Sequence, residues 1–554
     1  MKRLSTLLLG ALALTTAAAQ TPRDNHPDEL PFAMPEVTLP AIPEREATLT
    51  GFGGDPSGAR LSTEAFAAAI DHLAAQGGGT LRIPAGVWHT GPIVLRSNIR
   101  LEVERGAIIL FSNDKSLYPL VETSFEGYDN TRRCQSPISA RGARNIAITG
   151  QGVIDGNGEY WRPLKREKVN ESTWRRITAR GGCYKRPTYW FPSEQALRGD
   201  AVADMNVPRT LTTDEEWAAV KDFLRPVMVS LIDCENILLQ GVVFQNSPAW
   251  NIHPLLCRNL TVDGVTVRNP SYAQNGDGID IESCRNVIVR DSRFDVGDDG
   301  ICIKSGKDKA GRDRGIPCEN IIVDDCIVFH GHGGFVVGSE MSGGVKNVMV
   351  SNCTFSGTDV GLRFKSTRGR GGVVENIRIE NIAMNDIVQD ALLFDLFYGG
   401  KSASEAVEEG TGEATDMVLR PVDETTPAFR NIHIRNVWCR GARRAMFFNG
   451  LPEMNVEHVT VENARIFART GAEICESTDV LLRDVTVVPE RGPALKLNNV
   501  KKFRAEEFSC PEGMECALQA TGSRNRDILV SSKEITSANA CLSAGAAGAV
   551  TIDE

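Results

Sequence analysis

Long apolar runs and an excess of basic residues are both missing from this sequence. After residue 20 no stretch reaches about eighteen apolar residues, so we expect no membrane-spanning helix. Lysine and arginine together number 61 against 71 aspartates and glutamates, which gives a formal net charge of -10. Nucleic-acid binding requires a basic surface, so the charge argues against nucleic acid as a partner. A polyanionic ligand would have to meet a local basic patch within an acidic protein.

The N-terminus has the pattern of a secretory signal peptide over residues 1–19. Lys2 and Arg3 form a basic region, residues 7–14 an apolar core, and Ala17–Ala19 a small-residue cleavage site. We therefore expect export to the periplasm or the extracellular space. Residues 20–45 then read as a Pro-rich lead-in. Export also makes disulfides possible among the 14 cysteines.

An asparagine recurs along the chain, and each copy is followed by alternating apolar residues, as in NILLQGVVF and NLTVDGVTV. From Asn236 on, the spacings run from 23 to 34 residues, apart from one of 55 that spans about two repeats. Alternating β-branched runs at this period predict one coil of a parallel β-helix per repeat. The positions are Asn145, Asn236, Asn259, Asn286, Asn320, Asn347, Asn376, Asn431 and Asn455. We expect left-handed turns and stacked amides there.

A cysteine stands two residues before four of these asparagines, at Cys234, Cys257, Cys284 and Cys318. In stacked coils their Cα atoms would lie within disulfide reach. A ladder of small buried thiols is the simpler interpretation, and we favour it. Cys510 and Cys516, in a late loop-rich stretch, are the better disulfide pair from sequence.

The repeats suggest a division of the chain around one β-helix. Residues 46–115 are expected to hold an N-terminal cap and the first coils, because LSTEAFAAAIDHLAAQGGG is an amphipathic helix that Ser62 or Thr63 can cap and Gly77–Gly79 can end. Residues 116–490 are the main β-helix, and residues 491–554 the C-terminal coils and end cap. Residues 160–224 interrupt the repeat as a long insertion, with a capping box at Thr213 and Glu216.

Laying four coils over one another brings charged residues into one patch. Gly278-Ile-Asp-Ile, Gly300-Ile-Cys-Ile, Gly334-Phe-Val-Val and Gly361-Leu-Arg-Phe align, with the first and third residues after each glycine pointing inward. The outward columns, with the positions just before the glycines, then place six residues on neighbouring coils: Asp277, Asp298, Asp299, His332, Arg363 and Lys365. Lys304 falls in the same outward column as Lys365.

Three carboxylates so close together repel one another. A calcium site or a solvated acidic edge would be the simplest explanation of the cluster. Acid–base chemistry on an anionic substrate explains the histidine and the two cations as well. Inverting cleavage of a glycosidic bond needs one protonated carboxyl and one ionised carboxylate, and crowding can supply that asymmetry. Arg363 and Lys365 can bind a sugar carboxylate.

At these residues the sequence resembles the polygalacturonase family of glycoside hydrolases, glycoside hydrolase family 28. Four short motifs carry the resemblance, in the family's order and on consecutive coils. They are Asn275-Gly276-Asp277, Asp298-Asp299, Gly331-His332-Gly333 and Arg363-Phe364-Lys365. The likeness extends from about residue 46 to about residue 450. It implies an all-β fold: a single-stranded right-handed parallel β-helix of the pectin-lyase-like kind, with an N-terminal capping helix and loop insertions.

The resemblance also implies roles for individual residues. Asp298 would be the general acid, and Asp277 and Asp299 would activate the water. His332 would tune the protonation of the acid. Arg363 and Lys365 would bind the galacturonate carboxylate, with Asn275, Lys304 and Tyr398 as further substrate contacts. The family uses no metal and no cofactor, and we expect a monomer that acts on pectic polysaccharide or oligogalacturonides.

Two departures from compact endo-acting members favour the exo-acting bacterial branch. Gly276 stands where many endo-enzymes have Thr or Ser, and the stretch between Asp299 and His332 is longer. It carries Lys307, Lys309, Arg312 and Arg314. Together with the 160–224 insertion, which carries Trp161, Trp174, Trp217 and a basic run, it could close one end of the groove. A rhamnogalacturonan or xylogalacturonan hydrolase is the alternative within the family. A calcium-dependent pectate lyase and a non-catalytic polysaccharide-binding β-helix are the alternatives outside it.

Overall fold

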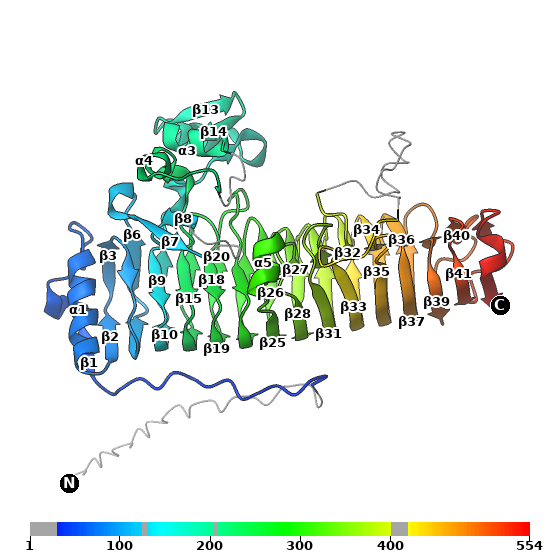
Figure 1. The fold of residues 1–554 in the computed structure, drawn as a ribbon, viewed down its shortest axis with the longest axis horizontal. Coiled ribbons are helices and arrows are strands. Elements are labelled where there is room, and N and C mark those ends of the chain that lie inside the picture. The colour runs from blue at the N-terminus through cyan, green and yellow to red at the C-terminus, as the bar shows by residue number, and fades with distance from the viewer. Residues whose placement is uncertain (1–29, 125–130, 203–207, 400–418, 554) are drawn as a thin grey trace, which may run out of the picture.

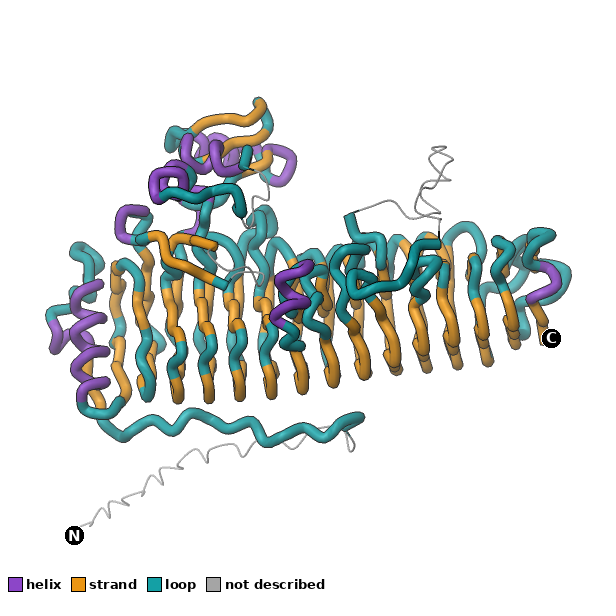
Figure 2. Tube along the Cα trace, in the orientation of Figure 1, coloured by secondary structure: helices purple, strands orange, loops and turns teal. Residues whose placement is uncertain are grey.

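The protein folds into a long parallel β-helix, seen here in a computed structural model (Figure 1). The structure describes residues 30–124, 131–202, 208–399 and 419–553. The expected signal peptide, residues 1–19, lies outside the described residues. Residues 30–45 of the lead-in have no helix or strand. The coils stack along one axis, with their strands aligned from end to end (Figure 2). The predicted all-β, parallel β-helical class is confirmed.

One side of every coil contributes a strand to a single parallel sheet, here called sheet B. Among the described residues it has fourteen strands, which follow one another in chain order. They are β4 (Ile93–Val94), β9 (Ile138–Arg141), β15 (Val229–Ile232), β18 (Ile252–Leu255), β21 (Ile279–Glu282), β24 (Asp299–Lys304), β27 (Gly333–Gly338), β30 (Val360–Lys365), β32 (Asp390–Asp395), β34 (Arg444–Asn449), β36 (Thr470–Cys475), β38 (Leu495–Asn498), β40 (Leu518–Thr521) and β42 (Ala540–Leu542).

The other sides of the coils form two parallel ladders, which together make sheet A. The first ladder holds β1 (Glu46–Thr48), β2 (Gly79–Ile83), β5 (Ile99–Val103), β10 (Arg144–Gly150), β16 (Glu235–Gln240), β19 (Arg258–Asp263), β22 (Arg285–Arg290), β25 (Cys318–Asp324) and β28 (Val345–Ser351). The second holds β3 (Gly86–Thr90), β6 (Ala107–Phe111), β11 (Val153–Asp155), β17 (Val243–Gln245), β20 (Thr266–Arg268), β23 (Arg293–Asp295), β26 (Ile327–Phe329) and β29 (Thr354–Ser356).

Toward the C-terminus the two ladders merge into strands of 13 residues each, which pair with one another over nearly their full length. These are β31 (Val373–Asn385), β33 (Ala428–Arg440), β35 (Val456–Ala468) and β37 (Ser477–Pro489). Shorter strands complete the last coils: β39 (Lys501–Glu506), β41 (Arg526–Ser531) and β43 (Val550–Asp553). Coils therefore continue to residue 553.

The asparagine column exists and stabilises the turns. From Asn145 to Asn376 each amide donates to the side-chain oxygen of the asparagine one coil before, at 3.0 to 3.3 Å, and the backbone is left-handed. Asn455 is not part of it. Arg430 pairs with Glu457 and Ile432 with Val459, so His458 is the residue level with Asn431, and Asn455 instead donates to Leu451. A short loop before β35 shifted the spacing on which that prediction relied.

The cysteine ladder consists of free thiols, as favoured from sequence. Cys234, Cys257, Cys284 and Cys318 are buried and unbridged. The prediction of a Cys510–Cys516 disulfide is wrong, because Cys516 bonds to Cys541, 25 residues on, and Cys510 is a free buried thiol. Cys516 lies just before β40 and Cys541 lies within β42, which pairs with β40, so the bridge joins adjacent coils. Proximity in the sequence does not reveal such a partner.

The N-terminal helix α1 (Thr63–Ala75) covers the first coil, with Ala65, Phe66, Ala69, Ile70 and Leu73 buried. Ser62 is its N-cap residue, but its hydroxyl accepts from Asp55 N rather than from the helix. Gly77–Gly79, all with positive φ, end it as expected. No helix among the described residues is long and apolar enough to cross a membrane.

An insertion projects from the N-terminal half of the β-helix (Figure 1). A hairpin of β7 (Leu120–Thr123) and β8 (Thr131–Cys134) precedes it. Its other elements are β12 (Leu164–Lys165), α2 (Glu171–Thr178), β13 (Cys183–Arg186), β14 (Tyr189–Phe191), α3 (Glu194–Asp200) and α4 (Asp214–Ala219). The capping box at Thr213 and Glu216 is present at the start of α4. A further helix, α5 (Asp308–Arg314), lies between β24 and β25.

Candidate active site

Four consecutive strands of sheet B, β21, β24, β27 and β30, bring the predicted patch together. Their register pairs Asp280 with Cys302, Cys302 with Val336, and Val336 with Arg363. The neighbouring outward column pairs Glu282 with Lys304, and Gly338 with Lys365. This is the alignment that the sequence predicted. It holds because inward Ile, Val and Phe residues fix the strand register, and a shift by one residue would expose them.

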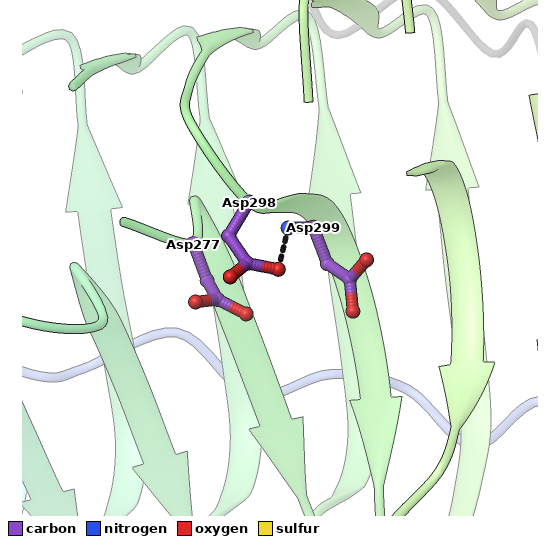
Figure 3. A group of neighbouring side chains, drawn as sticks. All are labelled: Asp277, Asp298 and Asp299. Atoms are coloured by element: carbon purple, nitrogen blue, oxygen red, sulfur yellow. Dashed lines mark hydrogen bonds between the residues drawn. The ribbon is translucent and has the colours of Figure 1, made fainter. Parts of the chain in front are cut away.

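Asp277, Asp298 and Asp299 lie together where β21 and β24 begin (Figure 3). One carboxylate oxygen of each lies within 4.8 Å of the others. Asp299 N donates to Asp298 Oδ1 at 3.0 Å, which fixes the orientation of the Asp298 side chain. Asp298 is the most exposed of the three, whereas Asp277 and Asp299 are 3% and 1% exposed. The pair at the bottom is thus sheltered from water, and Asp298 forms the outer edge.

Asp299 is an ionised carboxylate held by two cations. Lys365 Nζ donates to its Oδ2 at 2.7 Å, and Arg363 Nη1 to its Oδ1 at 3.3 Å. Burial raises the pKa of Asp299, but the charges of Lys365 and Arg363 outweigh burial and hold that pKa well below its usual range. The residues expected to bind the substrate carboxylate therefore also set the charge of a catalytic candidate.

Asp277 has the opposite environment. Its Oδ1 has no hydrogen-bond partner among the described residues. Burial, and then the neighbouring carboxylates Asp280 and Asp298, raise the pKa of Asp277 well above its usual range. Of the two residues assigned to water activation, Asp299 is therefore ionised and Asp277 favours the protonated form in the free protein. The pKa values of Asp277 and Asp299 are therefore shifted in opposite directions, and the assignment of the general acid stays a prediction.

His332 lies beside Asp298, on the next coil toward the C-terminus. His332 Nδ1 is 3.0 Å from Asp298 Oδ1, and its Nε2 is 3.9 Å from Asp359 Oδ2. The hydrogen bond with Asp298 is the main cause that raises the pKa of His332 above its usual value. The pair can hold a proton at the edge of the site, where the side chain of His332 is 37% exposed.

The carboxylates line a cavity of about 310 Å³. Its floor and C-terminal side are formed by Asn275, Asp277, Asp298, Asp299, Lys304, Glu340, Lys365 and Tyr398. Its N-terminal side is formed by Arg133 of the β7–β8 hairpin, by Phe223, Leu224, Arg225 and Val227 after α4, and by Ala249 and Trp250. Lys307 and Arg370 complete the rim. A smaller and more apolar cavity of about 190 Å³ adjoins it and shares Arg133 and Val227.

The other predicted substrate contacts differ in their exposure and in the bonds they already make within the protein. Asn275 Oδ1 accepts from Arg225 Nη2 at 2.8 Å, and its backbone is left-handed. Lys304 is buried and committed to Glu340, at 2.9 Å, with Asp280 at 3.6 Å. Tyr398 is 38% exposed, with Lys365 Nζ 5.1 Å from its ring centroid. The structure therefore places all three at the cavity, with Tyr398 the most accessible.

The insertion contributes to the cavity differently from what its sequence suggested. Its tryptophans were expected to stack on sugars, but Trp161, Trp174 and Trp217 are buried within the insertion and its base. Arg166 and Arg175 pair with Glu171, and Arg176 pairs with Glu159. These charges stabilise the insertion and leave the cavity wall to other residues.

The loop after Gly306 behaves in a similar way. Lys307 lines the cavity, whereas Lys309 pairs with Asp313 and Arg314 with Glu282. Arg312 donates to the carbonyl of Gly369 at 2.6 Å. Arg312 and Arg314 therefore hold the loop on the β-helix, whereas the Lys309–Asp313 pair lies within α5 itself.

Sequence reasoning missed the residues that support the site from a distance in the chain. Arg225 is buried and donates to the carbonyls of Pro248 and Gln274 as well as to Asn275. The ring centroid of Trp250 lies 4.9 Å from Lys304 Nζ. Asp280 is fully buried near Asp277; its oxygens accept no hydrogen bond from a described residue, but Lys304 Nζ lies 3.6 Å from its Oδ1. Arg225 directly follows the predicted 160–224 insertion, and that position was the available signal for it. Nothing in the repeat pattern pointed to its partners.

Asp277, Asp298 and Asp299 are also the group best placed to hold a divalent cation among the described residues. The two cations already bonded to Asp299 act against such an ion, because like charges at short range repel. The chemistry that the donor set fits best is acid–base catalysis on an anionic ligand.

Comparisons with known proteins agree with this site. A sequence model described as "Glycosyl hydrolases family 28" matches residues 220–442, a segment that contains every predicted site residue. A "Probable polygalacturonase" of Vitis vinifera is 26% identical over 466 residues, 81% of this chain and 81% of that protein. An "Endo-polygalacturonase" of Pectobacterium carotovorum subsp. carotovorum is 26% identical over 407 residues, 73% of this chain and 85% of that protein.

A solved structure is similar over most of the chain. It is described as a hyperthermoactive exopolygalacturonase from Thermotoga maritima, is 31% identical, and superposes with a TM-score of 0.62. The match covers 81% of this chain and 94% of that one.

Proposed function

The chain belongs to glycosyl hydrolases family 28, and we propose that it is an exported polygalacturonase that releases galacturonate units from chain ends. The substrate would be polygalacturonate or its oligomers, cut at α-1,4-galacturonosidic bonds. The buried cations beside three carboxylates support an anionic sugar at the point of cleavage. Export rests on the signal-peptide pattern of residues 1–19.

The residues have distinct roles in this proposal. Asp298 gives its proton to the leaving glycosidic oxygen as the C–O bond breaks, and His332 orients it and keeps a proton at the pair. Asp299 is ionised and takes a proton from the water that attacks the sugar carbon, beside Asp277. Arg363 and Lys365 bind the sugar carboxylate and Tyr398 flanks them. No step requires a metal ion.

The row of side chains on the N-terminal side of the cavity is the single observation that carries the exo mode. Cleavage within a chain requires a groove open at both ends. Here Arg133, Phe223, Leu224, Arg225 and Val227 line the side toward the first coils. Arg225 is anchored by carbonyls on two loops, at 2.9 Å each, so this side has a rigid base. A chain end can enter such a pocket, while a continuous chain would meet the wall.

The experiment is a time course of polygalacturonate digestion, followed by anion-exchange chromatography and viscometry. Early release of mono- or digalacturonate with little loss of viscosity supports the exo mode. A ladder of mid-sized oligomers with rapid loss of viscosity would instead indicate an open groove and an endo-enzyme. Asp298→Asn serves as the catalytic control and should lose roughly 10²–10⁴-fold in rate, the usual value of general acid catalysis.

Parallel digests separate the alternative substrates and reactions. Faster release from rhamnogalacturonan or xylogalacturonan than from polygalacturonate would replace the proposed substrate. Products that absorb in the ultraviolet would indicate a lyase. Binding without any product would indicate a non-catalytic β-helix.

A further inference from the structure

A second groove lies on the C-terminal coils, away from the catalytic cavity. It has a volume of about 690 Å³. Its lining comes from four successive coils and comprises Asp386, Ile387, Val388, Gly441, Ala442, Arg443, Phe467, Ala468, Arg469, Val488, Pro489 and Glu490. We call it the distal groove. None of the residues that line the catalytic cavity belongs to it.

The distal groove continues the same row of turns that carries the catalytic residues. Backbone hydrogen bonds link these turns from coil to coil. His332 N donates to Asp298 O, Asp359 N to Gly331 O, and Gln389 N to Asp359 O. Arg443 N then donates to Gln389 O, Thr470 N to Arg443 O, and Arg491 N to Arg469 O. Arg443 is thus four coils beyond Asp298, which at ~4.8 Å per coil is a distance of ~19 Å along the axis.

The chemistry of the distal groove is that of a site for an acidic sugar chain. Arg443 and Arg469 line it, and Arg491 is exposed on the next coil. No ion pair or side-chain hydrogen bond joins these three guanidinium groups to any other described residue. Phe467 and Val388 in the same groove are 53% and 57% exposed, and an exposed ring can pack on the apolar face of a sugar.

Acidic residues are present as well and do not cancel this charge. Asp386 and Glu490 line the groove, and Asp386 accepts from the amide of Asn385 at 3.0 Å. Arg443, Arg469 and Arg491 together place three arginines at the distal groove, against the two acidic residues Asp386 and Glu490. The whole protein has a net charge of -10. Neighbouring arginines without a charged partner repel one another, and an anionic ligand bound between them would reduce that repulsion.

The side chains that line the N-terminal side of the catalytic cavity set the direction that we infer for a bound chain. The wall of Arg133 and Phe223 to Val227 lies toward the first coils, so the rest of a chain must leave toward the later ones. His332 and Asp359 lie on that path, with side chains 37% and 35% exposed. The distal groove begins with Asp386 to Val388 on the coil of Gln389, which is the next coil after that of Asp359.

We propose that the distal groove binds the uncleaved part of the uronate chain whose end occupies the catalytic cavity. Arg443, Arg469 and Arg491 bind successive carboxylates, and Phe467 packs against a sugar ring. The inference rests on the proposed polygalacturonase function. It means that the protein grips long chains more tightly than the short oligomers that fill the cavity alone.

The test compares long and short substrates with an Arg443→Ala/Arg469→Ala variant. The wild type and the variant are assayed on polygalacturonate and on trigalacturonate, which is too short to reach Arg443 from Asp298. We expect KM on polygalacturonate to rise about 3- to 10-fold, since each exposed charge contact contributes modestly. The kinetic constants on trigalacturonate should be unchanged. Arg268→Ala/Arg293→Ala, which removes the same charge from exposed positions of β20 and β23, is the matched control.

Three results would overturn the inference while leaving the proposed function intact. An unchanged KM on polygalacturonate would show that the distal groove does not hold the chain. Equal losses on polymer and trimer would show an effect on the catalytic cavity or the fold. A dimer of the wild type that dissociates in the variant, seen by size-exclusion chromatography, would assign the groove to a second copy of the chain.

Failure of the proposed function would appear separately, as a wild-type protein that does not cleave polygalacturonate. The distal groove is then tested by electrophoresis in gels that contain polygalacturonate. Retardation of the wild type and of the Arg268→Ala/Arg293→Ala control, but not of Arg443→Ala/Arg469→Ala, supports a uronate-binding groove. Equal retardation of all three proteins contradicts it.

Discussion

Lys365 Nζ donates a hydrogen bond of 2.7 Å to Asp299 Oδ2 across two coils of sheet B. The two side chains are 7% and 2% exposed, so the ion pair is almost free of solvent screening. Lys365 was expected to contact the substrate, and it also keeps the proposed base ionised. An arriving sugar carboxylate would share Lys365 with Asp299, which couples substrate binding to the charge of the base.

Replacing Lys365 with methionine should therefore alter the pH dependence as well as substrate binding. The pKa of Asp299 is depressed in the folded protein, so Asp299 stays ionised in acid solution. Without Lys365 that pKa rises, and the acidic limb of the kcat/KM profile should move to higher pH. Lys346→Met, which removes an exposed partner of Glu319 outside the cavity, is the control. An unmoved acidic limb in Lys365→Met would show that Lys365 acts on the substrate alone.

Asn substitutions at Asp299 and Asp277 should have unequal costs in stability. Asp299→Asn leaves Lys365 buried without its counter-charge, and breaking a buried ion pair typically costs about 3–5 kcal/mol. Asp277 favours the protonated form, which an Asn side chain resembles in shape and charge, so Asp277→Asn should cost much less. Chemical denaturation of the two variants at neutral pH measures both values. Similar losses would mean that Asp277 is ionised in the folded protein.

Stacked coils explain why so much of the site could be predicted from sequence. In a β-helix, residues one repeat apart lie one above the other, so a linear alignment places Asp277, Asp299 and Arg363 correctly on neighbouring coils. The asparagine column was predicted correctly for the same reason up to the coil of Asn431. In the next coil a short loop shifts the register, so His458 and not Asn455 lies level with Asn431. Local spacing predicts structure only where no loop intervenes.

The walls of the cavity could not be predicted in that way. Whether Arg225 or Trp161 faces the cavity depends on the path of a long insertion that packs by its own small cores. The tryptophans and the basic run of the insertion were expected to line the cavity. The rings are buried instead, and the arginines pair with acidic residues of the protein. The hairpin residue Arg133, far upstream in sequence, reaches the cavity instead.

Removing the imidazole of His332 should move the alkaline limb of activity to lower pH. The hydrogen bond with Asp298 raises the pKa of His332, so the pair keeps a proton above the usual histidine value of about 6.5. In His332→Ala the pair loses the imidazole that holds this proton, so the alkaline limb should fall to lower pH. The kcat/KM profile measures the limb. An unchanged alkaline limb would exclude His332 from the protonation of the acid.

Stability gives an independent check on the same residue. A raised folded-state pKa stabilises the protein below the unfolded value of about 6.5, and this contribution disappears as the pH rises through the folded value. His332→Ala should therefore lower the melting temperature more at pH ~5 than at pH ~9. His458→Ala, at a histidine on a distant coil, serves as the control for a general loss of histidine. A loss that does not depend on pH would contradict the raised pKa.

Chelation should leave the activity unchanged. Although three carboxylates lie within 4.8 Å of one another, Lys365 and Arg363 neutralise Asp299 and repel a divalent cation. Dialysis against EDTA, followed by assay with and without added Ca²⁺, measures the effect. Loss of activity that Ca²⁺ restores would favour a lyase or a metal-assisted reaction over the acid–base mechanism.

The stereochemistry of the product tests the proposed roles of the aspartates as general acid and general base. Inverting glycosidases usually separate their two carboxyl groups by roughly 6.5–9.5 Å and retaining ones by roughly 5–5.5 Å. Here the nearest oxygens lie within 4.8 Å, closer than either range, so separation alone does not decide. The proposed roles, with Asp299 accepting a proton from the attacking water rather than bonding to the sugar carbon, require inversion. Proton NMR of the first product should show the β-anomer released from the α-linked substrate. Initial release of the α-anomer would mean a covalent intermediate and would reassign one aspartate as a nucleophile.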